Sequence, residues 1–183
     1  SEVIKMLQEN FGGCVIMSDE VARELMQKGN ISYQLIVEYF GRDILMDDGE
    51  IDRKKLADHV FNNKEALEKL NSMTHPYVKD EIRKLIAEAE ASGECRFVAL
   101  ESAILLECGY EDICDEFWYV YTKPEIRRQR MKETRNYSDE KVDSVMRNQQ
   151  PDEVFFEQCS FVIENNTTLS DVYDQLKEKL DQQ

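Results

Sequence analysis

Residues 13–25 read GCVIMSDEVAREL, an apolar run that passes directly into a helical pattern. The run GCVIM does not alternate with polar residues, which predicts a short strand buried on both faces. Ser18 and Asp19 follow at once and open a helical stretch over residues 19–28. A strand that runs into a helix is half of a βαβ unit, so this segment indicates an α/β protein.

Three further segments share this near-continuous apolar character. They are RFVALE (96–101), FWYVYT (117–122) and FVIEN (161–165). Helical patterns lie between the four runs, and this order is typical of parallel strands joined by crossovers. We therefore expect an α/β fold with a central parallel sheet.

The sequence between the first two predicted strands is long and almost wholly helical. Amphipathic stripes predict four helices at residues 30–41, 51–61, 63–73 and 75–92. Asn63 is placed to cap the third, and Thr74 precedes Pro76 near the first turn of the fourth. A crossover of this length predicts a helical subdomain, residues 30–92, inserted beside the sheet.

The chain after the third predicted strand is rich in charge. KPEIRRQRMKETR (123–135) and SDEKVDSVMRNQQ (138–150) predict two helices, with Ser138 capping the second. Their polarity predicts an exposed flap over residues 123–150. The last stretch, LSDVYDQLKEKL (169–180), is amphipathic, and we expect it to lie against the sheet edge.

The composition limits the classes of partner. The net charge of −15 at pH 7 argues against duplex nucleic acid. A small anionic ligand needs only a local basic cluster, such as residues 123–135. No run approaches the roughly 18 apolar residues of a membrane span, and no signal peptide opens the chain, so we expect a cytoplasmic protein with no membrane partner.

The five cysteines are scattered and form no C-x-x-C pair. Several lie in apolar runs, which predicts buried, reduced core residues, and a redox role is the alternative. They are Cys14, Cys95, Cys108, Cys114 and Cys159.

Polar residues stand where the predicted strands end, at the edge where open parallel sheets bind ligands. Asp19 follows the first strand, Glu101 ends the second and Asn165 ends the fourth. A carboxylate there can orient a hydroxyl or hold the water shell of a metal. The alternatives are helix capping for Asp19 and a solvated strand end for Glu101.

The basic and histidine side chains can also be interpreted either as structural or as functional residues. The arginines of residues 123–135 can form a solvated helix face, or they can contact phosphate oxygens. An arginine-rich flap is similar to the lid of a phosphoryl-transfer enzyme. His75 can simply occupy the first turn of a helix, and His59 is expected to be structural.

The motifs, in their order and spacing, resemble the dephospho-CoA kinase family over nearly the whole chain. The segments that carry the resemblance are VIMSDEVAREL, YFGRDIL with DGEIDRKKLADHVF, LNSMTHPYV, AILLECGYEDICDEFWYVY, RMKETRNYS with MRNQQ, and FVIENN. That family uses ATP and Mg²⁺ to phosphorylate the 3′-hydroxyl of dephospho-CoA, the final step of coenzyme A biosynthesis.

The resemblance also implies a fold and a domain layout. The family has a three-layer P-loop NTPase-like fold with a central parallel sheet. A single kinase domain over residues 1–183 is therefore implied, with a CoA-binding subdomain at 30–92 and a lid at 123–150. Met17 departs from the family by standing where an Asp is common, and Ala103 by replacing a usual Pro.

The resemblance further implies roles for single residues. Asp19 would orient or deprotonate the attacking hydroxyl, and Arg130 would act on the transferring phosphate. The dephospho-CoA side would be lined by Asp19, Arg23, Arg53 and His75. The nucleotide would be bound by Ser1, Glu2, Arg130, Arg135 and Asn165, and Mg²⁺ by Ser1 and Glu101.

The largest departure lies at the front of the chain. The family opens with a strand and G-x-x-x-x-G-K-[ST], whereas here Ser1 takes the place of the last motif residue and EVIKMLQENFG follows as a helix. The strand would be central in the sheet, and unpaired buried backbone groups cost roughly 1–3 kcal/mol each. We expect roughly a dozen further residues upstream, and no ATP turnover by these 183 residues alone.

Two other functions stay open at this point. One is a different small P-loop kinase that acts on a nucleoside or small metabolite. The other is a non-catalytic binding or regulatory protein that begins at Ser1. The sequence leaves the oligomeric state open.

Overall fold

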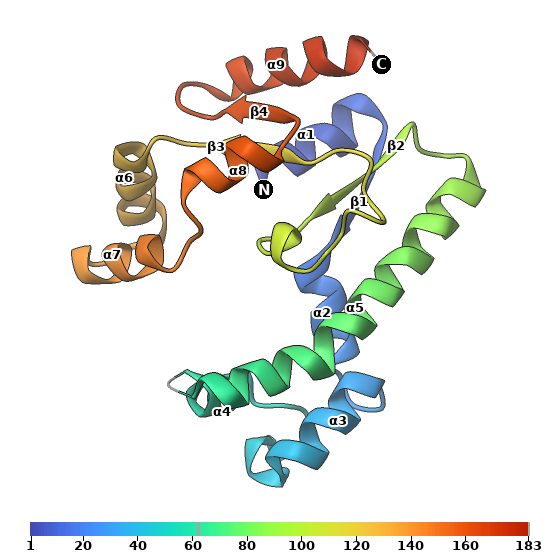
Figure 1. Ribbon diagram of the computed structural model, residues 1–183, viewed down its shortest axis with the longest axis vertical. Helices are drawn as coiled ribbons and strands as arrows, with labels where there is room; N and C mark the ends of the chain where they lie inside the picture. The colour runs from blue at the N-terminus through green and yellow to red at the C-terminus, as the bar shows by residue number, and fades with distance from the viewer. Residues whose placement is uncertain (62, 183) are drawn as a thin grey trace. The chain divides into compact units, whose positions relative to one another are not determined.

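The computed structural model describes residues 1–61 and 63–182 of the chain (Figure 1). In chain order the elements, with η for short 3-10 helices, are α1 (Glu2–Phe11), β1 (Gly13–Met17), α2 (Ser18–Leu25), α3 (Ile31–Phe40), η1 (Arg42–Ile44), α4 (Arg53–Val60), α5 (Lys64–Ser92), β2 (Phe97–Glu101), η2 (Leu105–Glu107), β3 (Trp118–Tyr121), α6 (Pro124–Arg135), α7 (Asp139–Arg147), α8 (Asp152–Gln158), β4 (Phe161–Glu164) and α9 (Leu169–Asp181).

The chain divides into two compact units. One consists of Ser1–Phe11 with Glu111–Gln183, and the other of Gly12–Tyr110. All four predicted strands are present, each within one residue of its expected bounds. The helices α3 to α5 occupy the predicted subdomain and α6 with α7 the predicted flap. The domain boundaries themselves stay predictions.

A two-stranded parallel sheet organises the unit Gly12–Tyr110. β1 pairs with β2 in a register that runs from Gly13 opposite Phe97 to Met17 opposite Glu101. The Arg96 N–H extends the ladder by donating to the Gly12 carbonyl over 2.9 Å. α5 packs against both strands and against α2.

The helical part of this unit has a core of its own. Its buried members are Ile36, Ile44, Ile51, Leu56 and Met73, and Ile36 and Ile44 are fully buried. They come from α3, η1, α4, α5 and the turn before α4, so the stripes that predicted the helices meet in one cluster. Residues 46–50 form a turn between α3 and α4, with Gly49 at a φ of 84°.

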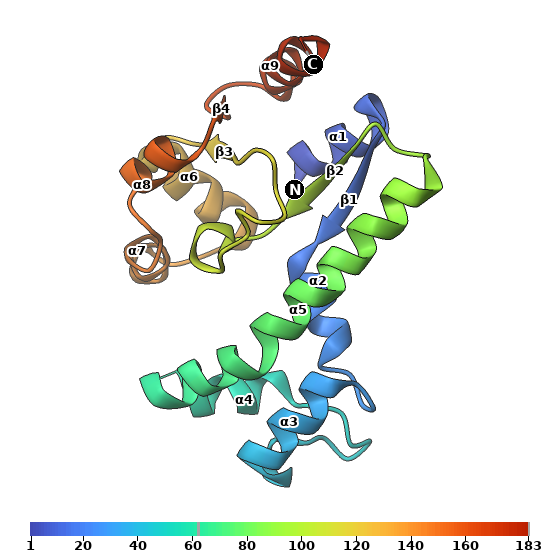
Figure 2. The same cartoon turned by 45° about the vertical axis from the view of Figure 1, so that its right-hand side comes forward.

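The helix α5 corrects the prediction of two helices at 63–73 and 75–92. It is one helix, Lys64–Ser92, with Pro76 inside it, so Thr74 does not mark a helix start. A proline lacks the N–H of one helical bond, and Figure 2 shows α5 changing direction in its middle. Val78 and Ile82 beyond the proline are buried, so packing favours continuation. Asn63 caps α5 as predicted, accepting from Ala66 N–H at 3.1 Å.

A second two-stranded parallel sheet organises the other unit. β3 pairs with β4, from Trp118 opposite Phe161 to Tyr121 opposite Glu164. The last helix lies against the sheet edge as predicted, because the Gln175 side chain of α9 bonds both the N–H and the carbonyl of Glu164. α1 packs on α9 (Figure 1). The ring centres of Phe11 and Tyr173 lie 5.1 Å apart at this contact.

The flap and the chain that follows it differ from prediction in two ways. Ser138 caps α7 as expected, and α6 buries no residue, but Val142 of α7 is fully buried. The short helix α8 was not predicted. It is held by Phe155, whose ring stacks 4.7 Å from that of Tyr119 on β3.

The strands correct two further expectations. They form two two-stranded sheets, one in each unit, where one central sheet was predicted. They are also not buried on both faces: every residue of β2 is partly exposed, and Val120 of β3 is 40% exposed. An apolar run specifies a strand but not the number of its neighbours, and a strand with one ladder partner keeps more of its surface in solvent.

The cysteines also differ from prediction. Cys14 and Cys95 form a disulfide, while Cys108, Cys114 and Cys159 are free and only partly buried. Cys14 lies in β1 and Cys95 just before β2, and the parallel register brings their Cα atoms to 5.5 Å. Their separation of 81 residues hides this proximity in the sequence. Within residues 1–61 and 63–182, no helix is long and apolar enough to cross a membrane.

Candidate functional site

The register of the first sheet brings two predicted site residues to one edge. Met17 lies opposite Glu101, and both strands run in the same direction, so both end there. The chain leaves β1 through Ser18, the buried first residue of α2, and Asp19 follows in the first helical turn. Asp19 and Glu101 therefore come from neighbouring strand ends, as the sequence predicted.

Asp19 does not cap its helix. The N-cap of α2 is Met17, which makes no side-chain cap bond, and Asp19 is exposed in the first turn. The capping alternative is wrong, and a carboxylate at this position is favoured by the positive end of the helix dipole. Arg23 lies four residues further along α2, so it shares a helix face with Asp19, and it is exposed.

His75 does not occupy the first turn of a helix, which corrects one of its two interpretations. It lies inside α5 rather than in a first turn, and its Nδ1 is 3.5 Å from the Cys108 Sγ. One turn further, Lys79 Nζ donates to the Gly109 carbonyl and lies 5.6 Å from the Tyr110 ring centre. These contacts attach the loop that follows β2 to α5.

The remaining predicted substrate residue, Arg53, is the first residue of α4 and is exposed. The N-cap of this helix is Asp52, whose carboxylate accepts from the N–H groups of Lys54 and Lys55 at 3.0 and 3.2 Å. Arg53 is thus held by a well-capped helix end. His59 of the same helix is exposed, and its ring centre lies 6.3 Å from that of Phe40.

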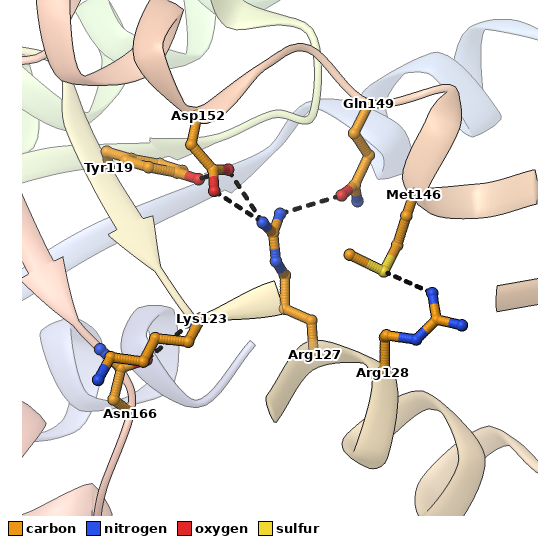
Figure 3. Close-up of polar contacts among 8 residues, drawn as sticks. All are labelled: Tyr119, Lys123, Arg127, Arg128, Met146, Gln149, Asp152 and Asn166. Carbon is orange, nitrogen blue, oxygen red and sulfur yellow. Dashed lines mark hydrogen bonds and ion pairs between the residues drawn. The ribbon is translucent and has the colours of Figure 1, made fainter. Parts of the chain in front are cut away.

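Asn165 and its neighbour join the strand ends of the second sheet. The Asn165 N–H donates to the Tyr121 carbonyl at 2.8 Å, and its carbonyl accepts from Thr122 Oγ1 at 3.3 Å. Asn166 Oδ1 accepts from the Lys123 N–H at 2.7 Å (Figure 3). Asn165 therefore lies at the carboxyl end of β4, as predicted.

The helix α1 carries the two predicted residues at the front of the chain. The Ser1 carbonyl accepts from the Lys5 N–H at 3.2 Å, and Glu2 is the first residue of α1. Both side chains are exposed. They therefore stand at the N-terminal end of a helix, where backbone N–H groups favour anions.

The arginines of α6 have unlike surroundings. Arg130 is partly buried, and Arg135 is exposed in the last turn. Arg128 pairs with Asp143 of α7 at 2.6 Å, and Lys132 pairs with Asp139. The hydrogen bond and charge of Lys132 lower the pKa of Asp139. These pairs tie α6 to α7.

The sequence did not predict the cluster around Arg127, for which a solvated helix face and a contact with phosphate oxygens were the two interpretations. Arg127 Nη2 donates to both carboxylate oxygens of Asp152, at 2.8 and 3.0 Å, and Nη1 donates to Gln149 Oε1 at 3.2 Å. The Tyr119 hydroxyl donates to Asp152 Oδ1 at 2.7 Å (Figure 3). Burial and this hydrogen bond raise the pKa of Tyr119 above its usual range. Pro151 before Asp152 signals the start of α8, but no sequence signal joins the three residues.

The predicted site residues divide between the two units. Asp19, Arg23, Arg53, His75 and Glu101 lie in Gly12–Tyr110, and Ser1, Glu2, Arg130, Arg135 and Asn165 lie in the other unit. Within each unit the structure brings several of them to strand or helix ends. The proposed metal ligands Ser1 and Glu101 come from different units.

These features define the class of protein. Parallel strands end in acidic and amide residues, and the arginine-rich helix α6 follows β3. Such a set of groups is typical of α/β proteins that bind phosphate-bearing ligands at strand ends.

Comparisons with known proteins identify the family within that class. The family model described as dephospho-CoA kinase matches residues 1–171. A dephospho-CoA kinase of Carboxydothermus hydrogenoformans is 36% identical over 176 residues, which cover 96% of this chain and 84% of that one. A dephospho-CoA kinase of Bacillus licheniformis is 36% identical over 182 residues, 99% of this chain and 89% of the relative. The chain belongs to the dephospho-CoA kinase family.

Solved structures agree with the fold. The crystal structure of TT1252 from Thermus thermophilus has a TM-score of 0.78 and 26% identity, covering 99% of this chain and 90% of the other. A dephospho-CoA kinase from Campylobacter jejuni has a TM-score of 0.69 at 23% identity, with the same coverage, and shows likeness of fold. The prediction of an α/β fold with parallel strands is thus confirmed.

Proposed function

We propose that this protein transfers the γ-phosphoryl group of ATP to the 3′-hydroxyl of dephospho-CoA, which completes coenzyme A. Membership of the dephospho-CoA kinase family supports this activity. The structural observation that carries it is the register that ends β1 and β2 at Met17 and Glu101 and so brings Asp19 to the same edge. Two carboxylates at one strand edge suit the activation of a hydroxyl beside a phosphate chain.

In this proposal Asp19 is the group that acts on the attacking hydroxyl. It accepts the hydrogen bond of the 3′-hydroxyl and takes its proton as the new O–P bond forms and the bond from the γ-phosphorus to the bridging oxygen breaks. ADP leaves with the electron pair of that bond. Asp19 is exposed and makes no cap bond, so its carboxylate is available for the substrate.

The remaining residues bind the two substrates. Arg23 shares the Asp19 face of α2 and would contact dephospho-CoA, together with Arg53 and His75. The nucleotide would be bound by Ser1, Glu2, Arg130, Arg135 and Asn165. Guanidinium groups match phosphate oxygens bidentately, which suits Arg130 to the transferring charge.

Mg²⁺ would enter with ATP. Among the described residues no three His, Cys, Asp or Glu side chains form a group that could hold a metal by themselves. Mg²⁺ needs only one or two carboxylates when phosphates and waters fill its other positions, so the single strand-end carboxylate of Glu101 fits such an ion. Glu101, through water, and the Ser1 hydroxyl would hold it, and the ion would neutralise phosphate charge.

The first prediction tests Asp19 in the protein expressed from its complete gene. Asp19→Asn should lower kcat for CoA formation by about 10²- to 10⁴-fold, because the amide cannot accept the proton. The KM for ATP should stay nearly unchanged. CoA formed from ATP, Mg²⁺ and dephospho-CoA is measured by chromatography.

Glu20, the residue after Asp19, provides a matched control. Glu20→Gln removes the same charge from the same exposed helical turn and should leave kcat nearly unchanged. Equal rates for Asp19→Asn and wild type would refute the role of Asp19. No CoA from the wild-type protein, with turnover of a nucleoside or another small metabolite in a parallel panel, would refute the proposed substrate.

A further inference from the structure

One carboxylate joins three elements of the unit that contains α6. Asp152 begins α8, accepts from Tyr119 of β3 at 2.7 Å, and accepts from Arg127 of α6 at 2.8 and 3.0 Å. We call these three residues the Asp152 cluster. Figure 3 shows Tyr119 and Arg127 pointing toward the Asp152 carboxylate from different elements.

The cluster is better shielded from water than the other ion pairs of α6. The side chains of Arg127 and Asp152 are 22% and 20% exposed, against 37% and 49% for Arg128 and Asp143. An exposed pair contributes little to holding two elements together because solvent and salt screen it. The Asp152 cluster is therefore the firmer attachment of α6.

The partners of the cluster are themselves held in place. The Tyr119 ring stacks on Phe155 and meets Phe156 edge-on at 5.5 Å, so strand β3 and helix α8 are packed together beside Asp152. Gln149 Oε1 accepts from the second terminal nitrogen of Arg127. A guanidinium held through both terminal nitrogens has little freedom to rotate.

The position of Arg127 on α6 links this attachment to Arg130. Residues three apart are neighbours on one face of a helix, and Arg130 is three residues beyond Arg127. Because the Arg127 guanidinium is held, the rotation of α6 about its axis is restricted. That rotation decides the direction in which Arg130 projects.

We propose that Tyr119, Asp152 and Arg127 are positioning residues that set the rotation of α6 and so aim Arg130 at the transferring phosphoryl group. The proposal rests on the proposed kinase function and adds three residues that need not touch the substrate. It explains why Asp152 combines a tyrosine and an arginine from separate elements.

The decisive experiment is a double-mutant cycle between the cluster and Arg130, measured by CoA formation in the protein expressed from its complete gene. Asp152→Asn should lower kcat by about 10- to 100-fold, the cost of a small misplacement of a catalytic group. The KM for dephospho-CoA should hardly change. In an Arg130→Ala background the same substitution should change kcat by less than about twofold, because the group that it positions is gone.

Milder variants keep the test valid if Asp152→Asn folds poorly. Tyr119→Phe removes only the hydroxyl and should give a smaller fall in kcat that also vanishes in the Arg130→Ala background. Arg127→Lys keeps the charge but loses the planar guanidinium that bonds through two terminal nitrogens. It should therefore not give wild-type kcat. Asp143→Asn breaks the exposed pair with Arg128 and serves as the matched control, with kcat unchanged.

The outcomes separate the inference from the function on which it rests. If the fold-changes in kcat of Asp152→Asn and Arg130→Ala multiply in the double variant, the two residues act independently. In protein with a wild-type melting curve, that result would overturn the inference and leave the kinase function intact. A wild-type protein that makes no CoA would overturn the function itself. Equal losses for Asp143→Asn and Asp152→Asn would also contradict the special role of the cluster.

Discussion

At the scale of single residues, short polar side chains decide where helices begin. Thr168 accepts from the Asp171 N–H at 3.2 Å, and the Asp171 carboxylate accepts from the Thr168 N–H at 3.1 Å. This reciprocal pair is a capping box at the start of α9. Hydrogen bonds from Thr167 and Thr168 lower the pKa of Asp171. The start of α9 thus depends on a few local bonds.

The second prediction concerns this cap. Thr168→Ala should lower the free energy of unfolding at pH 7 by about 1 kcal/mol. Because the folded pKa of Asp171 lies below its unfolded value, the carboxylate stabilises the fold above the unfolded pKa and loses this effect as pH falls through the folded pKa. The difference between variant and wild type should therefore shrink below about pH 4.

Urea unfolding at several pH values measures this difference. Ser170→Ala removes an exposed hydroxyl from the same first turn and serves as the control, with little expected change. A difference for Thr168→Ala that grows toward acidic pH would contradict the capping role of Asp171.

At the scale of elements, the disulfide attaches Cys14 near the start of β1 to Cys95, two residues before β2. The third prediction follows: protein purified without reductant should show three free thiols when denatured, those of Cys108, Cys114 and Cys159. Reduction should expose all five and lower the stability of the unit Gly12–Tyr110 by about 2–4 kcal/mol, because a long loop in the unfolded chain is no longer closed.

Thiol titration and urea unfolding with and without reductant check this result. Cys159→Ser should remove one free thiol and leave the effect of reductant unchanged. Burial raises the pKa of the Cys159 thiol, so it should react slowly in the folded protein. Five free thiols in the unreduced protein would show that the pair is not bonded.

The helices and strands also show which structural features the sequence pattern predicts correctly. The four apolar runs predicted the strands within one residue, and Asn63 and Ser138 predicted two caps, because these signals act over a few neighbouring residues. Pro76 misled the prediction, because the buried Val78 and Ile82 keep α5 continuous beyond it. Tertiary packing outweighed the helix-breaking tendency of the proline.

At the scale of the whole molecule, the net charge of −15 acts on every element at once. Like charges repel in the compact state, and dissolved salt screens the repulsion. The fourth prediction is that the melting temperature rises when ionic strength increases from about 0.01 M to about 0.15 M, over which the Debye length falls from roughly 30 to 8 Å.

Differential scanning calorimetry in NaCl measures the shift. Repeating the series in KCl separates screening from binding of a particular cation, since the two salts should act alike. A melting temperature that falls with salt would mean that attractive ion pairs, such as Arg127 with Asp152, outweigh the general repulsion.

The sequence by itself determined what depends on near neighbours: the places of the strands, several helix starts, and the residues that stand at strand ends. Only the tertiary structure decided the pairings. It joined Cys14 to Cys95, set Glu101 opposite Met17, and gave Asp152 both Tyr119 and Arg127 as partners. The reason is physical, because propensity and capping act along a few residues of chain, whereas strand register and side-chain packing join residues far apart in sequence.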